Sequence, residues 1–154
     1  MKIDPYKHKE RYFRWKDRVK DGIPEISRHN SDLVLQYLND MEKGLNIAQG
    51  SVKGSRSYIR LNTLKERLCW FAEKFKEFFD IEMDKIKEDQ LVGFFSDMKN
   101  GLIKRKDGGN YKSVATYAKV FKAFWHWHQK INRKKGIEVL DITLDLDTKQ
   151  DKPD

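Results

Sequence analysis

The chain has 154 residues, and its 32 Lys and Arg against 24 Asp and Glu give a formal net charge of +8. This length supports one domain with a proper core, and the basic balance favours a nucleic acid or another anionic partner. The single cysteine, Cys69, excludes an internal disulfide and a cysteine-based zinc site, and no apolar run approaches the roughly 20 residues of a membrane span. We therefore expect a cytoplasmic protein with no membrane partner.

Residues 1–23 combine cations with aromatic side chains. Tyr12, Trp15 and Val19 have the spacing of a helical stripe, and Gly22 followed by Pro24 ends the pattern. The segment is either a basic N-terminal arm or a helix that lies on the domain, and the sequence leaves both open.

An amphipathic helix is expected over about 31–43, with an apolar side formed by Val34, Tyr37, Leu38 and Met41. Residues 45–57 are rich in Gly, Ser and cations and predict an exposed connection.

A long helix is expected over about 57–79, with an apolar side formed by Leu61, Leu64, Leu68, Phe71, Ala72, Phe75 and Phe79. On the same wheel a polar ridge falls within a sector of about 80°. Its members are Arg56, Arg60, Thr63, Arg67, Trp70 and Lys74. The alternative is that these cations pair with Glu66, Glu73 and Glu77 on the helix surface, an interpretation that suits Lys74 best.

A shorter helix over about 87–99 packs Leu91, Phe94, Phe95 and Met98. The loop 102–113 that follows is basic through Lys104, Arg105 and Lys106, and Gly108 and Gly109 let its backbone turn freely.

The clearest helix and the densest positive charge coincide over 110–135, and segment 104–135 holds ten cations against the single acid Asp107. One side carries the apolar stripe Val114, Tyr117, Ala118, Phe121, Phe124, Trp125, His128 and Ile131. The other side carries Lys112, Lys119, Lys122, His126, Gln129 and Arg133. Ser113 is expected to cap the helix start, where backbone amides favour phosphate. A solvated face is the better interpretation of any single lysine, whereas the whole segment favours nucleic acid.

Residues 137–154 change abruptly to an acidic sequence with interleaved Ile, Val and Leu. No apolar segment elsewhere is long enough to form a sheet with them, so they predict an acidic interdomain linker or tail that leads to a domain outside this chain.

Catalytic chemistry has no matching pattern. His126 and His128 are two residues apart, so on a helix they point about 200° apart and cannot hold one metal together. The sequence contains neither a glycine-rich phosphate loop nor a nucleophile elbow. We expect no catalytic residue, no metal and no cofactor.

Four helices in the order short, long, short, long, with SYIRLNTLKERLCWFAEKF and KSVATYAKVFKAFWHWHQK as the long ones, resemble the N-terminal core-binding domain of tyrosine recombinases. This phage-integrase, SAM-like domain is matched over about 24–136, and the archaeal integrase type is the most similar. Leu68 and Phe71 fit the family pattern in the first long helix, and Ser113, Phe121 and the aromatic cluster from Phe124 to Trp127 fit it in the second. The pattern departs at Arg60, where the family usually has threonine.

The resemblance implies an all-α, four-helix SAM-like orthogonal bundle, with a further N-terminal helix if residues 1–22 fold. In the family, this domain and a separate catalytic domain clamp duplex DNA, with the two long helices across the major groove. The chain itself is then no enzyme, and its partners are double-stranded DNA, the catalytic domain of the same longer chain and other protomers of a synaptic assembly. The expected DNA-binding residues are Arg56, Arg60, Thr63, Arg67, Lys104, Arg105, Lys106, Lys112, Ser113, Lys119, Lys122 and Arg133.

Two alternatives belong to other classes of protein. A helical protein–protein interaction module, whose lysines only keep it soluble, predicts binding to an acidic protein and none to duplex DNA. An enzyme working alone through a histidine and a tyrosine predicts relaxation or covalent trapping of supercoiled DNA.

Overall fold

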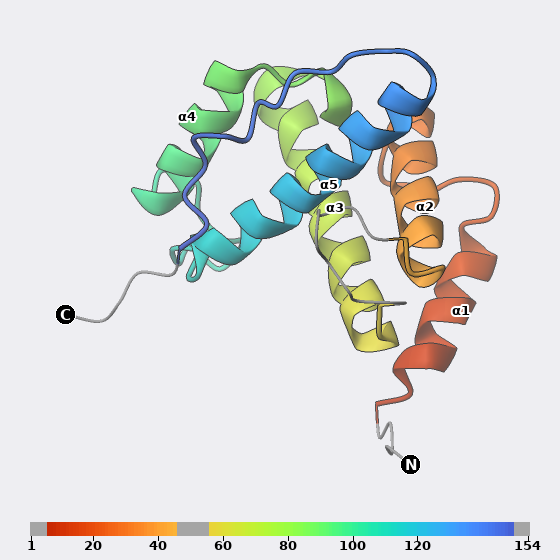
Figure 1. Cartoon of the computed structure of the whole chain (residues 1–154). Coiled ribbons are helices and arrows are strands. Elements are labelled where there is room, and N and C mark those ends of the chain that lie inside the picture. The colour runs from red at the N-terminus through yellow and green to blue at the C-terminus, as the bar shows by residue number, and fades with distance from the viewer. Residues whose placement is uncertain (1–5, 46–55, 150–154) are drawn as a thin grey trace. The chain divides into compact units, whose positions relative to one another are not determined.

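A computed structural model of the chain describes residues 6–45 and 56–149, and these residues form an all-α structure, which confirms the predicted fold class (Figure 1). The helices are α1 (His8–Arg18), α2 (Arg28–Glu42), α3 (Tyr58–Phe79), the 3-10 helix η1 (Met83–Lys85), α4 (Glu88–Lys99) and α5 (Val114–Lys134). Most of the predicted connection 45–57 lies outside the described residues. The SAM-like arrangement stays a prediction.

The chain divides into two compact units, residues 1–83 and 84–154. The sequence interpretation placed a single helical domain over 24–136 and did not anticipate this division.

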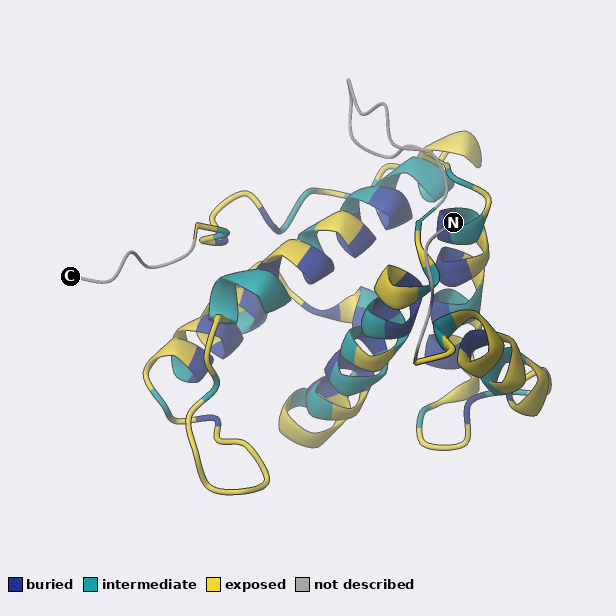
Figure 2. Cartoon of the chain, turned by 90° about the horizontal axis from the view of Figure 1, so that it is seen from below, coloured by how far each residue is buried: buried dark blue, intermediate teal, exposed yellow. Residues whose placement is uncertain are grey.

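In the first unit, α2 and α3 start at serine caps. The Ser27 hydroxyl accepts the backbone N–H of Asn30 at 3.1 Å, and the Ser57 hydroxyl accepts that of Arg60 at 3.2 Å. The cap at Ser27 begins α2 three residues before the predicted start. The predicted apolar side of α3 is buried from Leu61 to Phe75, as the dark blue stripe in Figure 2 illustrates.

Helix α1 packs on α3, so residues 8–18 are a helix on the domain and not an extended arm. Tyr12 is fully buried, with its ring 5.7 Å from that of Tyr58. The Asn62 amide donates to the His8 carbonyl at 3.0 Å. The Lys16 ammonium reaches α2, where it pairs with Glu42 at 3.1 Å.

In the second unit, α4 packs against α5. Helix α5 begins at Val114, four residues after the predicted start, and the residue before it, Ser113, is left-handed. Its buried side is wider than the predicted stripe, because Val120 and Trp127 are also buried. Val120 and Trp127 extend the buried side on one flank of α5, and the segment that follows the helix contacts the other flank through Trp125 and Gln129.

The acidic segment 137–149 turns back after α5 and runs antiparallel to it (Figure 1). The Gln129 amide donates to the Val139 carbonyl and the Trp125 indole N–H donates to the Leu140 carbonyl, each at 2.9 Å. Thr143 and Leu146 are buried. This segment was predicted to be a linker or tail, and in the structure it is held against its own unit.

None of the helices in the described part of the chain is both long enough and apolar enough to cross a membrane.

Candidate nucleic-acid interface

The predicted ridge on α3 is present in the first unit. Arg60 is exposed, whereas Arg56 and Arg67 are half-buried. Burial raises the pKa of the Tyr37 phenol to about 12, and the positive charges of Arg56 and Arg60 act in the opposite direction. Both guanidinium groups therefore lie near the end of α2 that carries Tyr37, and they concentrate positive charge at the N-terminal end of α3.

Two ridge members of α3 have their polar groups engaged within the helix. The Thr63 hydroxyl donates to the Ile59 carbonyl at 3.1 Å, so its lone pairs remain available but its proton is used. Lys74 forms an ion pair with Glu77 at 3.3 Å, which confirms the pairing predicted for this lysine. The cations of the ridge that can meet an anionic ligand therefore lie in its N-terminal half.

The basic loop 104–106 of the second unit is ordered by a small turn. Lys104 and Asn110 form an isolated antiparallel bridge, and the Lys104 ammonium donates to the Asn110 side-chain oxygen at 3.1 Å. Arg105 pairs with Asp107 at 2.8 Å. Gly108 has a φ of +84°, the left-handed conformation that the turn requires. Lys106 is exposed and has no ion-pair partner among the described residues.

The start of α5 differs from the prediction. Ser113 is exposed, has a φ of 58° and makes no side-chain cap to the helix, so the predicted cap is wrong. The Thr116 backbone N–H and hydroxyl instead donate to the Ser113 carbonyl. The Ser113 side chain therefore caps none of the first-turn amides, and Ser113 and the neighbouring Lys112 are both exposed.

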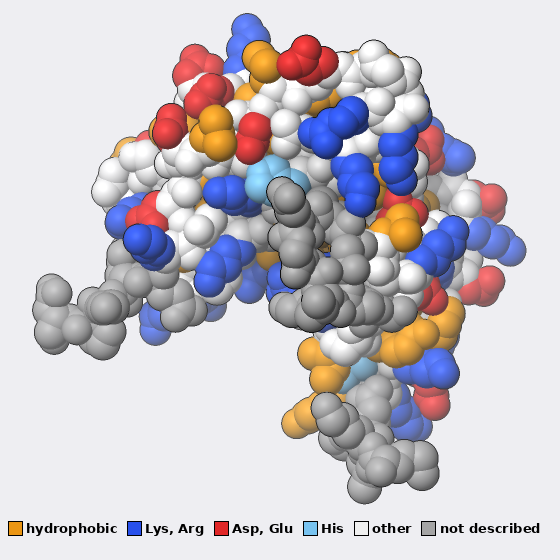
Figure 3. Space-filling model, in the orientation of Figure 1, with side chains coloured by type: hydrophobic (Ala, Val, Ile, Leu, Met, Phe, Trp, Pro, Cys, Tyr) orange, Lys and Arg blue, Asp and Glu red, His pale blue; other side chains and the backbone are white. Residues whose placement is uncertain are grey.

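The polar side of α5 divides into two parts. Lys119 and Arg133 are exposed and Lys122 is half-buried, and none of the three has an ion-pair partner among the described residues. His126 and Gln129, which were predicted on the same ridge, are covered by the acidic segment. In Figure 3, Lys and Arg side chains follow α5, while Asp and Glu side chains gather beside them along the C-terminal segment.

The contact between the segment and α5 is built around Asp141. One carboxylate oxygen lies 3.1 Å from Nε2 of His126, and the other accepts from the Thr143 hydroxyl at 2.5 Å and from the Thr143 backbone N–H at 2.9 Å. Burial alone would raise the pKa of Asp141, but these hydrogen bonds outweigh it and hold the pKa below its usual value. The carboxylate is therefore charged at neutral pH and satisfied within the unit.

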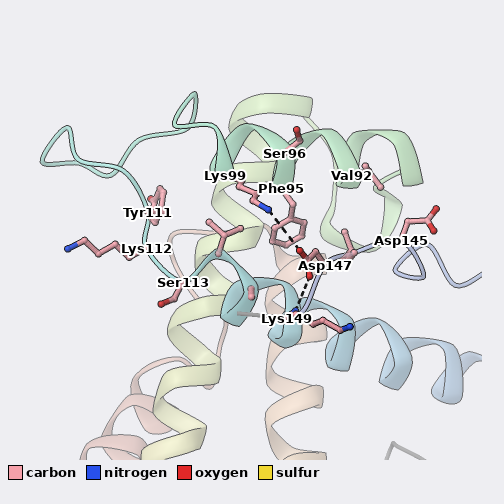
Figure 4. A pocket seen from close by; sticks show the side chains of 13 residues that line it. Val92, Phe95, Ser96, Lys99, Tyr111, Lys112, Ser113, Asp145, Asp147 and Lys149 are labelled. Carbon is pink, nitrogen blue, oxygen red and sulfur yellow. Dashed lines mark hydrogen bonds and ion pairs between the residues drawn. The ribbon is translucent and has the colours of Figure 1, made fainter. Parts of the chain in front are cut away.

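A pocket of about 560 Å³ lies between α4, the start of α5 and the C-terminal segment (Figure 4). Phe95 stands at its centre, and Lys99 reaches across to Asp147 at 4.0 Å. The Lys112 side chain extends away from this pocket. The Lys112 ammonium thus lies outside the pocket, although Lys112 and Ser113 are both among the residues that line it.

Sequence reasoning missed the docking of segment 137–149 on α5. The available signal was the combination of apolar residues in the acidic segment with the indole of Trp125 and the amide of Gln129, which both need acceptors when buried. Backbone carbonyls of an extended segment supply these acceptors.

Cys69, the single cysteine of the chain, is an unreactive thiol. Burial raises the pKa of Cys69 to about 12, and the charges of Glu73 and Glu25 act in the same direction. The thiol is therefore protonated at neutral pH, a state in which it is a poor nucleophile.

Comparisons with known proteins found no matching family model, no matching curated sequence and no matching solved structure.

Proposed function

We propose that this chain binds duplex DNA through the basic sides of α3 and α5, as the core-binding domain of a tyrosine recombinase does. Most contacts are made to phosphate groups, and Arg60, Thr63 and Ser113 supply limited reading of base edges. The resemblance of the two long helices to that family supports the proposal, and the family would place catalysis in a separate domain of the same longer chain.

One observation carries the proposal. Lys119, Lys122 and Arg133 stand on one side of α5 without an acidic partner among the described residues, while the opposite side of the helix is anchored by buried aromatic rings. The rigid helix fixes the spacing of these cations, so the backbone that carries them needs no ordering when the side chains meet phosphates. A ridge of this kind is better explained by binding to a polyanion than by solubility alone.

The test is duplex binding over a series of salt concentrations. If about five cations engage phosphates, log K falls with log salt at a slope of roughly −4.5. Replacing Lys119 and Lys122 by alanine removes two contacts, so the slope falls by about 1.8 and all duplexes are bound more weakly alike. A fluorescence anisotropy titration measures both quantities.

The matched control is the double variant Lys43→Ala/Lys85→Ala. It removes the same charge from exposed positions outside both ridges. The control should bind as the parent chain does. Equal losses in the two variants would mean that only net charge matters, and an unchanged affinity of the Lys119/Lys122 variant would refute the assigned ridge.

A protein–protein interaction module is the rival function, and one observation favours it. Ile137, Leu140 and Leu144 of the C-terminal segment are between 52% and 75% exposed, which is unusual for large apolar side chains so close together. The rival predicts no gel shift with duplex DNA and binding to a protein through this segment. Replacing Leu140 and Leu144 by serine would then abolish binding, whereas DNA binding should survive the same change.

A further inference from the structure

The cations of α1 take no part in the proposed DNA contacts, yet they form a second basic surface in the first unit. A shallow groove of about 1000 Å³ runs along α1 and includes Lys65 of α3. Of its eight lining residues, five are cations and two are acids, so the groove carries a net charge of +3. Its principal cations are Arg11, Arg14, Arg18 and Lys65.

The groove is held in a fixed shape by the packing of α1. The buried Tyr12 ring, the hydrogen bond from Asn62 to His8 and the ion pair from Lys16 to Glu42 fix α1 on its two neighbours. On a helical wheel Arg11, Arg14 and Arg18 lie within about 60° of one another. Their side chains therefore start from the same side of a helix that is held on both of its neighbours.

The groove keeps its net positive charge among the residues that the structure describes. Arg11, Arg14 and Arg18 make no side-chain hydrogen bond or ion pair with any residue that the structure describes. Lys65 lies over the Trp15 ring, 4.8 Å from its centroid. Burial lowers the pKa of Lys65, the charge of Glu66 opposes this, and the like charges of Arg11 and Arg18 lower the pKa further.

Three cations that repel one another at the edge of a groove favour a ligand that brings several negative charges at once. Along α1, Arg11 and Arg18 are seven residues apart, which is about 10 Å at the helical rise. One strand of duplex DNA places roughly three phosphates over that axial distance. A single carboxylate or one phosphate would meet only part of this row.

We propose that the groove formed by Arg11, Arg14, Arg18 and Lys65 binds a run of about three phosphates on the backbone of duplex DNA. This inference rests on the proposed function for the identity of the polyanion. It adds a phosphate contact on α1 to those expected from α3 and α5.

The experiment uses the full chain and the double variant Arg14→Gln/Arg18→Gln, with Lys20→Gln/Lys43→Gln as the charge-matched control. Both pairs are exposed, so circular dichroism should report the parental helix content for each. The groove variant should bind duplex about tenfold more weakly and lose about 1.8 from the salt slope, while the control stays close to the parent. Side-chain NMR should show the pKa of Lys65 rising when duplex is added.

Two results would overturn the proposal. One is parental affinity and salt slope in the groove variant, together with Lys65 resonances that do not respond to bound duplex. That outcome leaves the DNA-binding function intact, because the parent still binds. If the parent chain fails to bind duplex at all, the proposed function fails, and inorganic tripolyphosphate then probes the groove. A response of Lys65 to tripolyphosphate supports the groove as a phosphate site, and no response overturns it.

Discussion

At the scale of single residues, Tyr12 packs α1 on its unit but loses the hydration of its hydroxyl. Its side chain is fully buried, and its hydroxyl has no hydrogen-bond partner among the described residues. Burial raises the pKa of this phenol, as do the nearby Glu42 and Tyr58, so the O–H stays protonated and must be desolvated without compensation. The ring stabilises the unit while the hydroxyl opposes it.

Replacing Tyr12 by phenylalanine should therefore stabilise the first unit, by about 1 kcal/mol, because the ring remains and the unpaired hydroxyl is removed. Urea unfolding followed by circular dichroism measures the change. Tyr6→Phe is the control, since Tyr6 is 71% exposed and should show no effect. A loss of stability in the Tyr12 variant would show that the hydroxyl has an acceptor after all.

At the scale of elements, the docking of segment 137–149 on α5 depends on a charged Asp141. Its pKa lies below the usual value near 3.9, so the contact contributes its full stability above that value and loses it as the pH falls through the lower folded-state pKa. Acidification below about pH 4 should expose the Thr143 amide, which donates to Asp141 at neutral pH. Hydrogen exchange by NMR measures this protection.

The variant Asp141→Asn should lose much of that protection already at neutral pH, because the uncharged amide is a weaker acceptor for Thr143 and His126. Glu138→Gln is the matched control, since Glu138 is exposed and has no hydrogen-bond or ion-pair partner among the described residues. Protection of Thr143 that is independent of both pH and Asp141 would mean that the segment is held by Leu146 and the backbone hydrogen bonds alone.

The elements themselves were largely predictable from the sequence, since periodicity gave each long helix within a few residues. The residues at which the helices begin and end were less predictable. The start of α5 depends on a left-handed Ser113, a backbone conformation that residue type alone does not predict. The fate of His126 and Gln129 depends on a segment ten or more residues further along, a tertiary contact that no local pattern contains.

At the scale of the whole molecule, two features lay beyond sequence reasoning. The boundary between the two units, after Met83, falls within η1, so no glycine- or serine-rich linker marks it in the sequence. The fixed position of α1 turns a basic arm, which could have been mobile, into a second charged surface. The predicted DNA-binding residues are accordingly spread over both units.

The central claim is that the cations of α3 and those of α5 both contact duplex DNA, and a double-mutant cycle in salt tests it most directly. Arg60→Ala, Lys119→Ala and the combined variant are titrated with one duplex over a series of salt concentrations. Each single change should reduce the slope of log K against log salt by about 0.9, and the combined variant by about 1.8. A parental slope for Arg60→Ala, or a combined variant no different from Lys119→Ala, would contradict the claim.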